Sequence, residues 1–191
     1  QAAEEEQREQ TKKRNKLLYQ SEHDELTGLY NKRSLNRYLE DVFEACKLNE
    51  KELGILFLDI DYFKQLNDRY GHGKGDEGIC AVADTLKRIF PEDYVARYGG
   101  DEFLVVMPER DLTYAMEHAE LLCAGIRECK IPNEDSEVES WLTISVGGVC
   151  AIPKEPNRVW DFLSAADNTL YEQKKEQKGK VRFYQGEGKY L

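Results

Sequence analysis

The chain has 191 residues, a length that suits one mid-sized domain with a full hydrophobic core. Its formal net charge of −10 argues against a general nucleic-acid binder and against a protein that docks on anionic membranes, because both need a basic face. No apolar run approaches the length of a membrane span and no signal peptide opens the sequence. We therefore expect a cytoplasmic domain without membrane contact, whether or not a longer protein is anchored upstream.

Residues 1–20 are highly polar and predict a solvated helix, with Glu4 and Arg8 at the spacing of an ion pair on one helix face. Apolar residues are too scarce for the heptads of a coiled coil. Because the sequence starts inside this pattern, we expect residues 1–20 to connect an upstream sensor or regulatory region to a domain that spans residues 21–191.

A second helix is predicted after Asn31, which is a plausible N-cap residue. Six apolar or aromatic residues recur on it at helical spacing and predict one buried stripe. They are Leu35, Tyr38, Leu39, Val42, Phe43 and Cys46. The five cysteines of the chain fit no metal-ligand spacing and indicate reduced thiols, several of them in the core.

The segment from Leu53 to Ile60 is a continuous apolar run broken only near its end by Asp59. A strand without alternation has both faces covered, so we expect it to be central in a sheet. The sequence Asp59-Ile60-Asp61 then places two carboxylates on one side of the chain if it remains extended. We assign Asp61 to capping the next helix and Asp59 to chemistry.

A short helix is predicted from Tyr62 to Tyr70, followed by a glycine-rich loop at residues 71–75 and by Asp76 in N-cap position. A glycine-rich loop before a helix suggests phosphate binding, but this one lacks the Walker A and dinucleotide-binding spacings. An acidic residue there would also repel phosphate. Asp76 is therefore either a plain cap or a residue that binds a ligand rich in hydrogen-bond donors.

Gly99 and Gly100 precede two carboxylates, Asp101 and Glu102, and then an apolar run. This order predicts a hairpin whose turn leaves both carboxylates at a strand edge. Taken alone, such a stretch indicates a solvated turn. A ligand site is favoured only because Asp59 ends a neighbouring predicted strand.

The remaining elements are a helix at residues 111–130, a strand at 141–149, a helix from Trp160 and a closing strand at 181–184. Lys174 and Lys178 share one face near the end of the last helix, which is ordinarily a solvated terminus. The order predicts an α/β (α+β) fold with a ferredoxin-like βαββαβ core of the palm type. Its mixed central sheet would be flanked by helices.

Several of these stretches together resemble the GGDEF domain, the diguanylate cyclase domain of bacterial signalling, over about residues 21–184. The resemblance is carried by five motifs in the expected order and spacing. They are Asp24-Glu25-Leu26-Thr27-Gly28-Leu29-Tyr30-Asn31-Lys32-Arg33, Asp59-Ile60-Asp61-Tyr62-Phe63-Lys64 with Asn67 and Asp68, Gly71-His72 with Gly75-Asp76, Gly99-Gly100-Asp101-Glu102-Phe103, and Ala166-Asp167-Asn168-Thr169-Leu170-Tyr171.

The resemblance implies a site for Mg²⁺, or alternatively Mn²⁺, formed by Asp59, the Ile60 carbonyl, Asp101 and Glu102. Hard cations of this kind prefer oxygen ligands and are shared with substrate phosphates. It also implies that Asp101 is the catalytic base for the 3′-hydroxyl of the nucleotide and that Glu102 assists.

By the same resemblance, Asn67 and Asp76 bind guanine. A carboxylate accepts from both N1–H and the 2-amino group of that base, whereas adenine offers no such pair of donors. The resemblance implies that Lys64, Lys174 and Lys178 contact the phosphates. Phe63, Gly99 and Gly100 complete the expected substrate site.

Two positions depart from the family pattern. The family usually has Arg followed by Asn where this chain has Lys178 and Gly179, and lysine keeps the charge but lacks the bidentate fork. Many members also carry an Arg-x-x-Asp product-inhibition site before the glycine pair. Here Asp93 matches its Asp position but Phe90 stands at the Arg position, so we expect that inhibitory site to be absent.

The resemblance implies the condensation of two GTP molecules into cyclic di-GMP with release of two pyrophosphates, at a two-fold interface of a homodimer. Two alternatives remain open at this point. One is a catalytically weak or inactive domain that binds GTP or cyclic di-GMP as a regulatory module, for which Lys178 leaves room. The other is a nucleotidyl cyclase or polymerase-like enzyme that uses another base, which Asp76 disfavours.

Overall fold

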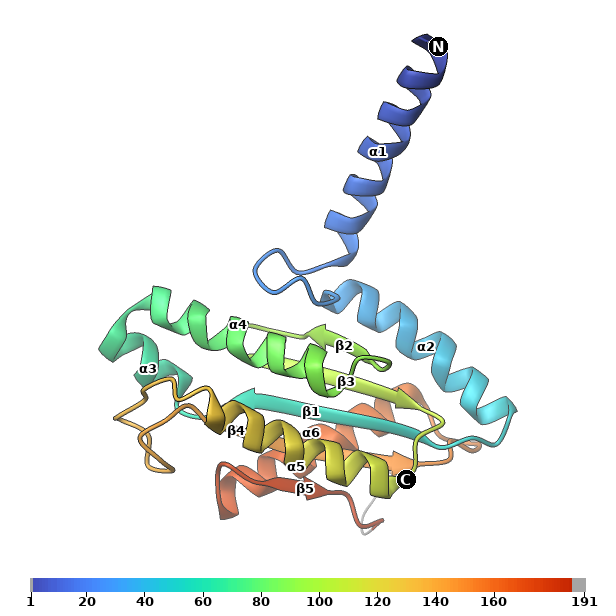
Figure 1. The fold of residues 1–191 in the computed structure, drawn as a ribbon. Helices are drawn as coiled ribbons and strands as arrows, with labels where there is room; N and C mark the ends of the chain where they lie inside the picture. The colour runs from blue at the N-terminus through green and yellow to red at the C-terminus, as the bar shows by residue number, and fades with distance from the viewer. Residues whose placement is uncertain (1, 187–191) are drawn as a thin grey trace.

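The computed structural model describes residues 2–186. Helices and strands follow one another in the predicted order (Figure 1). They are α1 (Ala2–Glu22), α2 (Lys32–Leu48), β1 (Leu53–Ile60), α3 (Phe63–Tyr70), α4 (His72–Ile89), β2 (Tyr94–Arg97), β3 (Glu102–Pro108), α5 (Leu112–Glu128), β4 (Ile144–Ala151), α6 (Val159–Glu176) and β5 (Val181–Phe183).

The strands form one sheet in the order β2-β3-β1-β4-β5. β1 is antiparallel to both of its neighbours, β3 and β4, whereas β5 runs parallel to β4. All eight residues of β1 are buried, as a strand at the centre of a sheet with both faces covered requires. The predicted mixed sheet, its central strand and the hairpin between β2 and β3 are confirmed.

Helices cover both faces of the sheet. In Figure 1, α4 and α5 lie in front of it and α6 lies behind. Successive β1 residues belong to different cores: Leu56 and Leu58 pack with residues of α4 and α5, whereas Ile55 and Phe57 pack with residues of α2 and α6. The continuous apolar run of β1 therefore supplies two cores at once.

Helix α6 approaches β4 closely because the strand carries glycine there. A Cβ atom on Gly147 would overlap the backbone of Ala166 and Leu170 in α6, and one on Gly148 would lie 2.5 Å from the Phe183 ring. Glycine at these two positions therefore permits the close approach of the neighbouring segments. This packing fixes the height of α6 over the sheet and so the position of Lys174 near its end.

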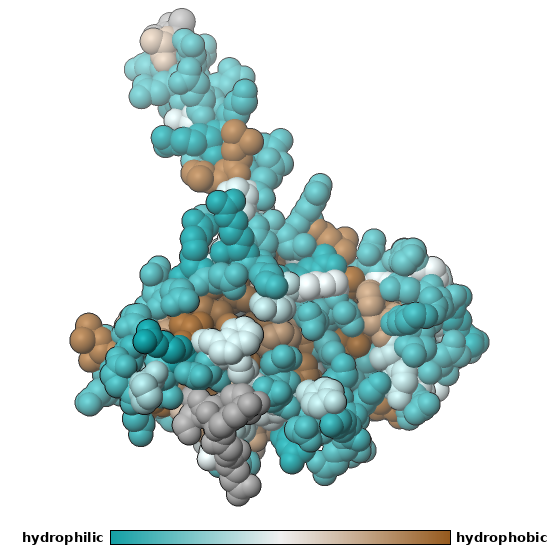
Figure 2. Space-filling model, turned by 180° about the vertical axis from the view of Figure 1, so that it is seen from behind, coloured by the Kyte–Doolittle hydropathy of each residue, from teal (hydrophilic) through white to brown (hydrophobic). Residues whose placement is uncertain are grey.

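Helix α1 projects away from the sheet, and its described side chains are almost all exposed (Figures 1 and 2). At its base, stacked rings join it to the domain: Tyr19 lies on His23, His23 on Tyr30, and Tyr30 on Tyr94 of β2. Within residues 2–186, none of the helices combines the length and the apolar content needed to cross a lipid bilayer.

The helix starts were predicted with mixed success. Asn31 caps α2 as expected, because its side chain accepts from the Ser34 amide. The glycine-rich segment at 71–75 was wrongly predicted as a loop: α4 begins at His72, so Asp76 lies inside the helix and is not its N-cap. Within residues 71–75, only Gly71, with φ at +87°, has a positive φ of the kind that favours glycine.

Candidate active site

The ends of β1 and β3 bring the predicted carboxylates together. The register of the antiparallel pair places Asp59 directly opposite Glu102, and the Asp101 carbonyl accepts from the Ile60 amide at 3.2 Å. Opposite residues on antiparallel strands have neighbouring side chains when they share a face. Asp59, Ile60, Asp101 and Glu102 thus occupy one edge of the sheet.

Asp59 is a buried carboxylate held in an unfavourable environment. Burial raises its pKa to about 6, and the nearby Asp61 and Asp101 charges add to this effect, whereas Lys174 opposes it. Lys174 of α6 donates to Asp59 Oδ2. Asp59 Oδ1 is buried and has no hydrogen-bond donor within the described part of the chain. The carboxylate is therefore only half satisfied.

Asp61 does not cap α3, and that prediction was wrong. The N-cap residue is Tyr62, in a left-handed conformation and without a side-chain cap. The buried Asp61 carboxylate instead accepts from the hydroxyls of Thr143 at 2.8 Å and Ser145 at 2.6 Å. These two hydroxyls belong to the segment that leads into β4 and to the strand itself, so Asp61 joins the end of β1 to its neighbour.

The chain supplies only part of the ligands that a divalent cation at this edge of the sheet would need. Among residues 2–186, no group of three or more His, Cys, Asp or Glu side chains is arranged to hold a metal ion. Burial raises the pKa of Glu102, and the adjacent Asp101 raises it further. A hard cation would relieve this repulsion and would occupy the unpaired Asp59 Oδ1, while substrate oxygens would complete its shell.

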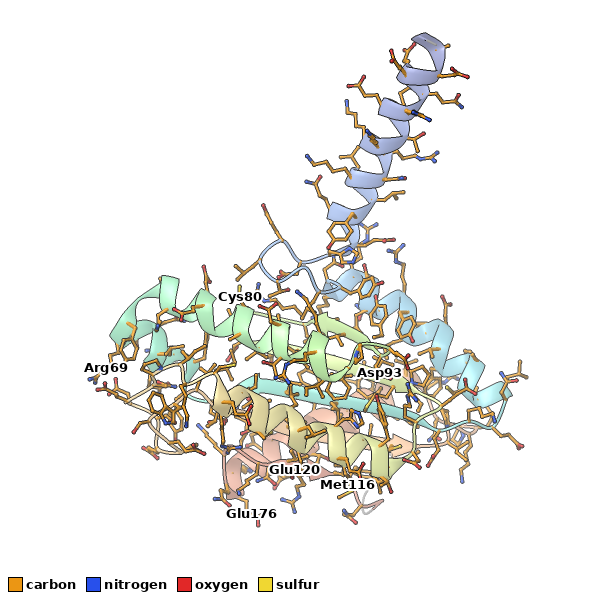
Figure 3. All side chains as sticks on the ribbon, in the orientation of Figure 1. Arg69, Cys80, Asp93, Met116, Glu120 and Glu176 are labelled. Carbon is orange, nitrogen blue, oxygen red and sulfur yellow. The ribbon has the colours of Figure 1, made fainter. Side chains whose placement is uncertain are left out.

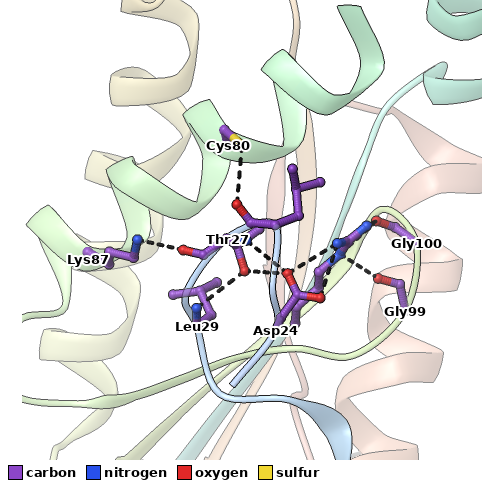
Figure 4. Close-up of polar contacts among 9 residues, drawn as sticks. Asp24, Thr27, Leu29, Cys80, Lys87, Gly99 and Gly100 are labelled. Atoms are coloured by element: carbon purple, nitrogen blue, oxygen red, sulfur yellow. Dashed lines mark hydrogen bonds and ion pairs between the residues drawn. The ribbon is translucent and has the colours of Figure 1, made fainter. Parts of the chain in front are cut away.

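The glycine turn is fixed by an arginine that the sequence predictions did not include. Arg97 donates to the carbonyls of Gly99 and Gly100 at 3.1 Å and 2.7 Å, and to both carboxylate oxygens of Asp24 at 3.2 Å (Figure 4). Thr27 also donates to Asp24 through its amide and its hydroxyl. Asp24 and Arg97 thereby tie the loop after α1 to the turn before Asp101.

The predicted guanine-binding residues lie where α3 meets α4. Asn67 Oδ1 is buried and has no donor in the described structure, which leaves an acceptor available for a ligand. A Cβ atom on Gly75 would overlap this oxygen and would lie 3.3 Å from the Phe63 ring. Gly75 therefore makes room for Asn67, and Asp76 follows it directly as an exposed residue.

The three predicted phosphate-binding lysines have three different environments. Lys64 is exposed and pairs with Asp68 one helical turn away. Lys174 is held by Asp59. Lys178 Nζ lies 4.0 Å from the centroid of the Tyr62 ring. The structure thus brings Lys174 into the carboxylate cluster, whereas Lys64 points into solvent.

Asp93, at the position of the family's inhibitory site, is engaged inside the domain. Its carboxylate accepts from the Tyr114 hydroxyl at 2.6 Å and lies 3.6 Å from Arg110, and only 2% of its side chain is exposed. Figure 3 shows it far along the domain from Arg69 of α3. The carboxylate is therefore inaccessible to a nucleotide in this structure.

Comparison with known proteins identifies the family. The sequence profile described as "Diguanylate cyclase, GGDEF domain" matches residues 21–180. The chain is 33% identical to the probable diguanylate cyclase DgcC of Escherichia coli K12, over 84% of this chain and 42% of that protein. It is 35% identical to the diguanylate cyclase VdcA of Vibrio cholerae, over 79% of this chain and 43% of that protein.

Among solved structures, the coiled coil and GGDEF domain of DgcB from Caulobacter crescentus, in complex with c-di-GMP, superposes with a TM-score of 0.85. It covers 95% of both chains at 23% identity, which establishes a common fold. The chain spans less than half the length of the two curated relatives. On the profile match and these identities, the chain belongs to the GGDEF diguanylate cyclase domain family.

Proposed function

We propose that residues 21–191 are a diguanylate cyclase domain that condenses two GTP molecules into cyclic di-GMP and two pyrophosphates. The observation that carries this proposal is the placement of Asp59 opposite Glu102, beside Asp101, with one buried Asp59 oxygen unpaired. A cluster of carboxylates at a strand edge is suited to an enzyme that binds a metal–triphosphate complex.

In this proposal each protomer binds one GTP. The 3′-oxygen of one GTP attacks the α-phosphorus of the other, a new P–O bond forms, and the bond to pyrophosphate breaks. Asp101 accepts the proton of the 3′-hydroxyl, and Glu102 beside it assists. Two such transfers close the ring and release two protons with the two pyrophosphates.

Asp59, the Ile60 carbonyl, Asp101 and Glu102 would hold Mg²⁺ or Mn²⁺, and diguanylate cyclases of this family are generally metal-dependent. When bound, such an ion supplies positive charge that stabilises the leaving pyrophosphate and lowers the pKa of the attacking hydroxyl. Lys174, which already lies at Asp59, would extend the same positive potential toward the phosphates.

Selectivity for guanine would come from the α3–α4 junction. The buried Asn67 oxygen accepts from the base, and Asp76 accepts from N1–H and the 2-amino group. Adenine would leave these acceptors unpaired, which a buried polar site disfavours. Phe63 lies against the same junction and would contact the base.

One protomer supplies half of the active site, because the two GTP molecules must face each other for in-line attack. A two-fold homodimer satisfies this geometry. We infer that residues 1–20 couple such pairing to an upstream sensor or regulatory region, since α1 ends at the loop that Arg97 joins to the glycine turn.

A regulatory module that binds GTP or cyclic di-GMP without turnover is the second candidate. It is favoured by the Lys174–Asp59 ion pair, which occupies one oxygen of an expected metal ligand, and by Lys178 in place of arginine. Retention of Asp59, Asp101 and Glu102 favours the cyclase.

The test is incubation of the protein with Mg²⁺ and GTP, ATP or both, with products identified by mass. The cyclase predicts cyclic di-GMP from GTP alone and none from an Asp101→Ala variant. Bound but unconverted GTP would support the regulatory module, and an adenine-containing product would support a cyclase of other specificity. A cyclic product that persisted in Asp101→Ala would overturn the catalytic assignment.

A further inference from the structure

Lys178 and Tyr62 form a cation–π pair beside the candidate active site. The Lys178 ammonium lies 4.0 Å from the Tyr62 ring centroid, and both side chains are only partly exposed. In the described part of the chain, no carboxylate lies within ion-pair distance of Lys178; its charge acts on the buried Asp61 carboxylate, and its direct contact is the Tyr62 ring. The ammonium therefore remains available to an anion that approaches from solvent.

The backbones that carry this pair are anchored to the same buried carboxylate. Asp61, which precedes Tyr62, accepts from the Ser145 hydroxyl, and that hydroxyl accepts from the amide of Gly179, which follows Lys178. Arg127 also donates to the Gly179 carbonyl at 2.7 Å. The two residues are thus held at a defined separation although they are far apart in sequence.

The ring itself is held from its outer edge by the acidic loop, residues 133–140. The Tyr62 hydroxyl donates to Glu137 at 3.1 Å. The same loop is fixed to α3 by Arg69, which donates to Glu134 and Asp135. Asn133 at its start donates to the Asp61 carbonyl. The orientation of the ring is therefore set from both sides.

We propose that Tyr62 is a positioning residue that orients Lys178 toward the phosphates of the bound nucleotide. The inference rests on the proposed function, because it takes nucleotide phosphates as the anion that Lys178 meets. Lysine is a flexible point charge, whereas the arginine usual at this position carries a rigid fork. A cation–π contact fixes an ammonium over an aromatic face, so the Tyr62 ring limits the rotamers of Lys178. The ring thereby restores part of the rigidity that arginine would have supplied.

The variants follow from this geometry. Tyr62→Leu removes the ring and, being unbranched at Cβ, adds no strain at a backbone φ of +53°. Tyr62→Phe keeps the ring and removes only the bond to Glu137. Lys178→Ala removes the charge. Lys175→Ala is the matched control, because Lys175 is an exposed lysine of α6 that also lies over a ring, that of Tyr171.

The primary measurement is the equilibrium affinity for 3′-deoxy-GTP, which lacks the attacking hydroxyl, and for guanosine, which lacks phosphates. We expect Tyr62→Leu to weaken binding of 3′-deoxy-GTP about three- to ten-fold and to leave guanosine binding unchanged. KM for GTP should rise by a similar factor with a smaller change in kcat. Tyr62→Phe and Lys175→Ala should each change the affinity less than about two-fold.

A double-mutant cycle decides whether the ring acts through the lysine. In the Lys178→Ala background, Tyr62→Leu should weaken the binding of 3′-deoxy-GTP by less than about two-fold. If Tyr62→Leu weakens 3′-deoxy-GTP binding as much in the Lys178→Ala background as in the wild type, the proposal is overturned. It is also overturned if Tyr62→Leu weakens guanosine binding as much as 3′-deoxy-GTP binding. Either result would indicate that the ring only supports α3. Tighter binding by Tyr62→Leu would also overturn it, because the ring would then withhold the lysine from phosphates.

Failure of the proposed function gives a different pattern. A wild-type protein that binds 3′-deoxy-GTP but forms no cyclic di-GMP would contradict the cyclase, while the coupling between Tyr62 and Lys178 would still support the positioning role. Normal cyclic di-GMP formation without that coupling would contradict the positioning role alone. Thermal unfolding of each variant identifies any that fail to fold.

Discussion

Lys174 donates to Asp59, so a lysine from α6 neutralises the buried carboxylate at the end of the central strand. The ion pair joins an expected phosphate-binding residue to an expected metal ligand. A lysine and a divalent cation would therefore both stabilise the same carboxylate charge.

Lys174→Ala should destabilise the protein in the presence of a chelator. Loss of the lysine leaves a buried charge unpaired, and we expect a loss of about 1–3 kcal/mol in the free energy of unfolding, less than for a fully buried pair because Lys174 is partly exposed. Added Mg²⁺ should raise the melting temperature of this variant more than that of the wild type. Lys175→Ala serves as the control, and equal Mg²⁺ shifts in wild type and Lys174→Ala would argue against a metal at Asp59.

The Asp24–Arg97 pair predicts a pH-dependent contribution to stability. Burial works to raise the pKa of Asp24, but hydrogen bonds from Thr27 and Arg97 outweigh it and hold the pKa below its ordinary value of 3.8. The stabilisation is therefore present above pH 3.8 and lost as the pH falls through the lowered pKa. Asp24→Asn should lower the free energy of unfolding by roughly 1–2 kcal/mol at pH 7.

The difference between wild type and Asp24→Asn should narrow in acid, which thermal unfolding at pH 7 and near pH 3 measures. Cyclic di-GMP formation by Asp24→Asn at pH 7 should also fall, because Arg97 holds the glycine turn through the same guanidinium. A difference in stability that stays constant across this pH range would show that the carboxylate charge plays no part.

Gly75→Ala should weaken nucleotide binding more than it affects folding. The added methyl group would overlap Asn67 Oδ1 and displace that side chain from the α3–α4 junction. Gly78→Ala is the matched control on the same helix, since its nearest neighbour would be Leu66 at 3.5 Å, an ordinary contact. We expect KM for GTP to rise about ten-fold or more in Gly75→Ala, from the loss of a hydrogen bond to the base, and to stay unchanged in Gly78→Ala. Equal KM values in both variants would remove Asn67 from the proposed guanine site.

Product inhibition through Asp93 is not expected. Both of its oxygens face groups of the domain itself, Tyr114 and Arg110. Asp93→Ala should therefore leave the sensitivity of the cyclase to added cyclic di-GMP unchanged. It should lower the melting temperature, because the buried Tyr114 bond is lost. Tight binding of cyclic di-GMP by a variant with its substrate-site residues neutralised would contradict this expectation.

Much of the sheet and the carboxylate cluster could be predicted from the sequence because both follow from local patterns. The unbroken apolar run of β1 indicated a central strand, and a hairpin carrying Asp101 and Glu102 had to place them at a strand edge. Their meeting with Asp59 needed only one correct pairing, that of β1 with β3.

Other features depend on contacts between distant segments. The interpretation of Asp61 as a cap was reasonable locally, but Thr143 and Ser145, about 80 residues later, supply its donors. The start of α4 was missed because the glycines at 73 and 75 favour loops locally. In the structure residue 75 is helical, and it is glycine because a Cβ atom there would overlap the Asn67 side chain. For Arg97 the sequence offered only a weak signal, a single cation two residues before the glycine pair. Nothing in the sequence pointed to Asp24 as its ion-pair partner.

The dependence of cyclic di-GMP formation on protein concentration tests the central claim most directly, since two protomers must bring two GTP molecules together. With saturating GTP and Mg²⁺, and product identified by mass, the rate per chain should rise with concentration until dimerisation is complete. A rate per chain that is unchanged on dilution into the monomeric range would contradict the two-fold active site, and the absence of cyclic di-GMP at every concentration would contradict the cyclase itself.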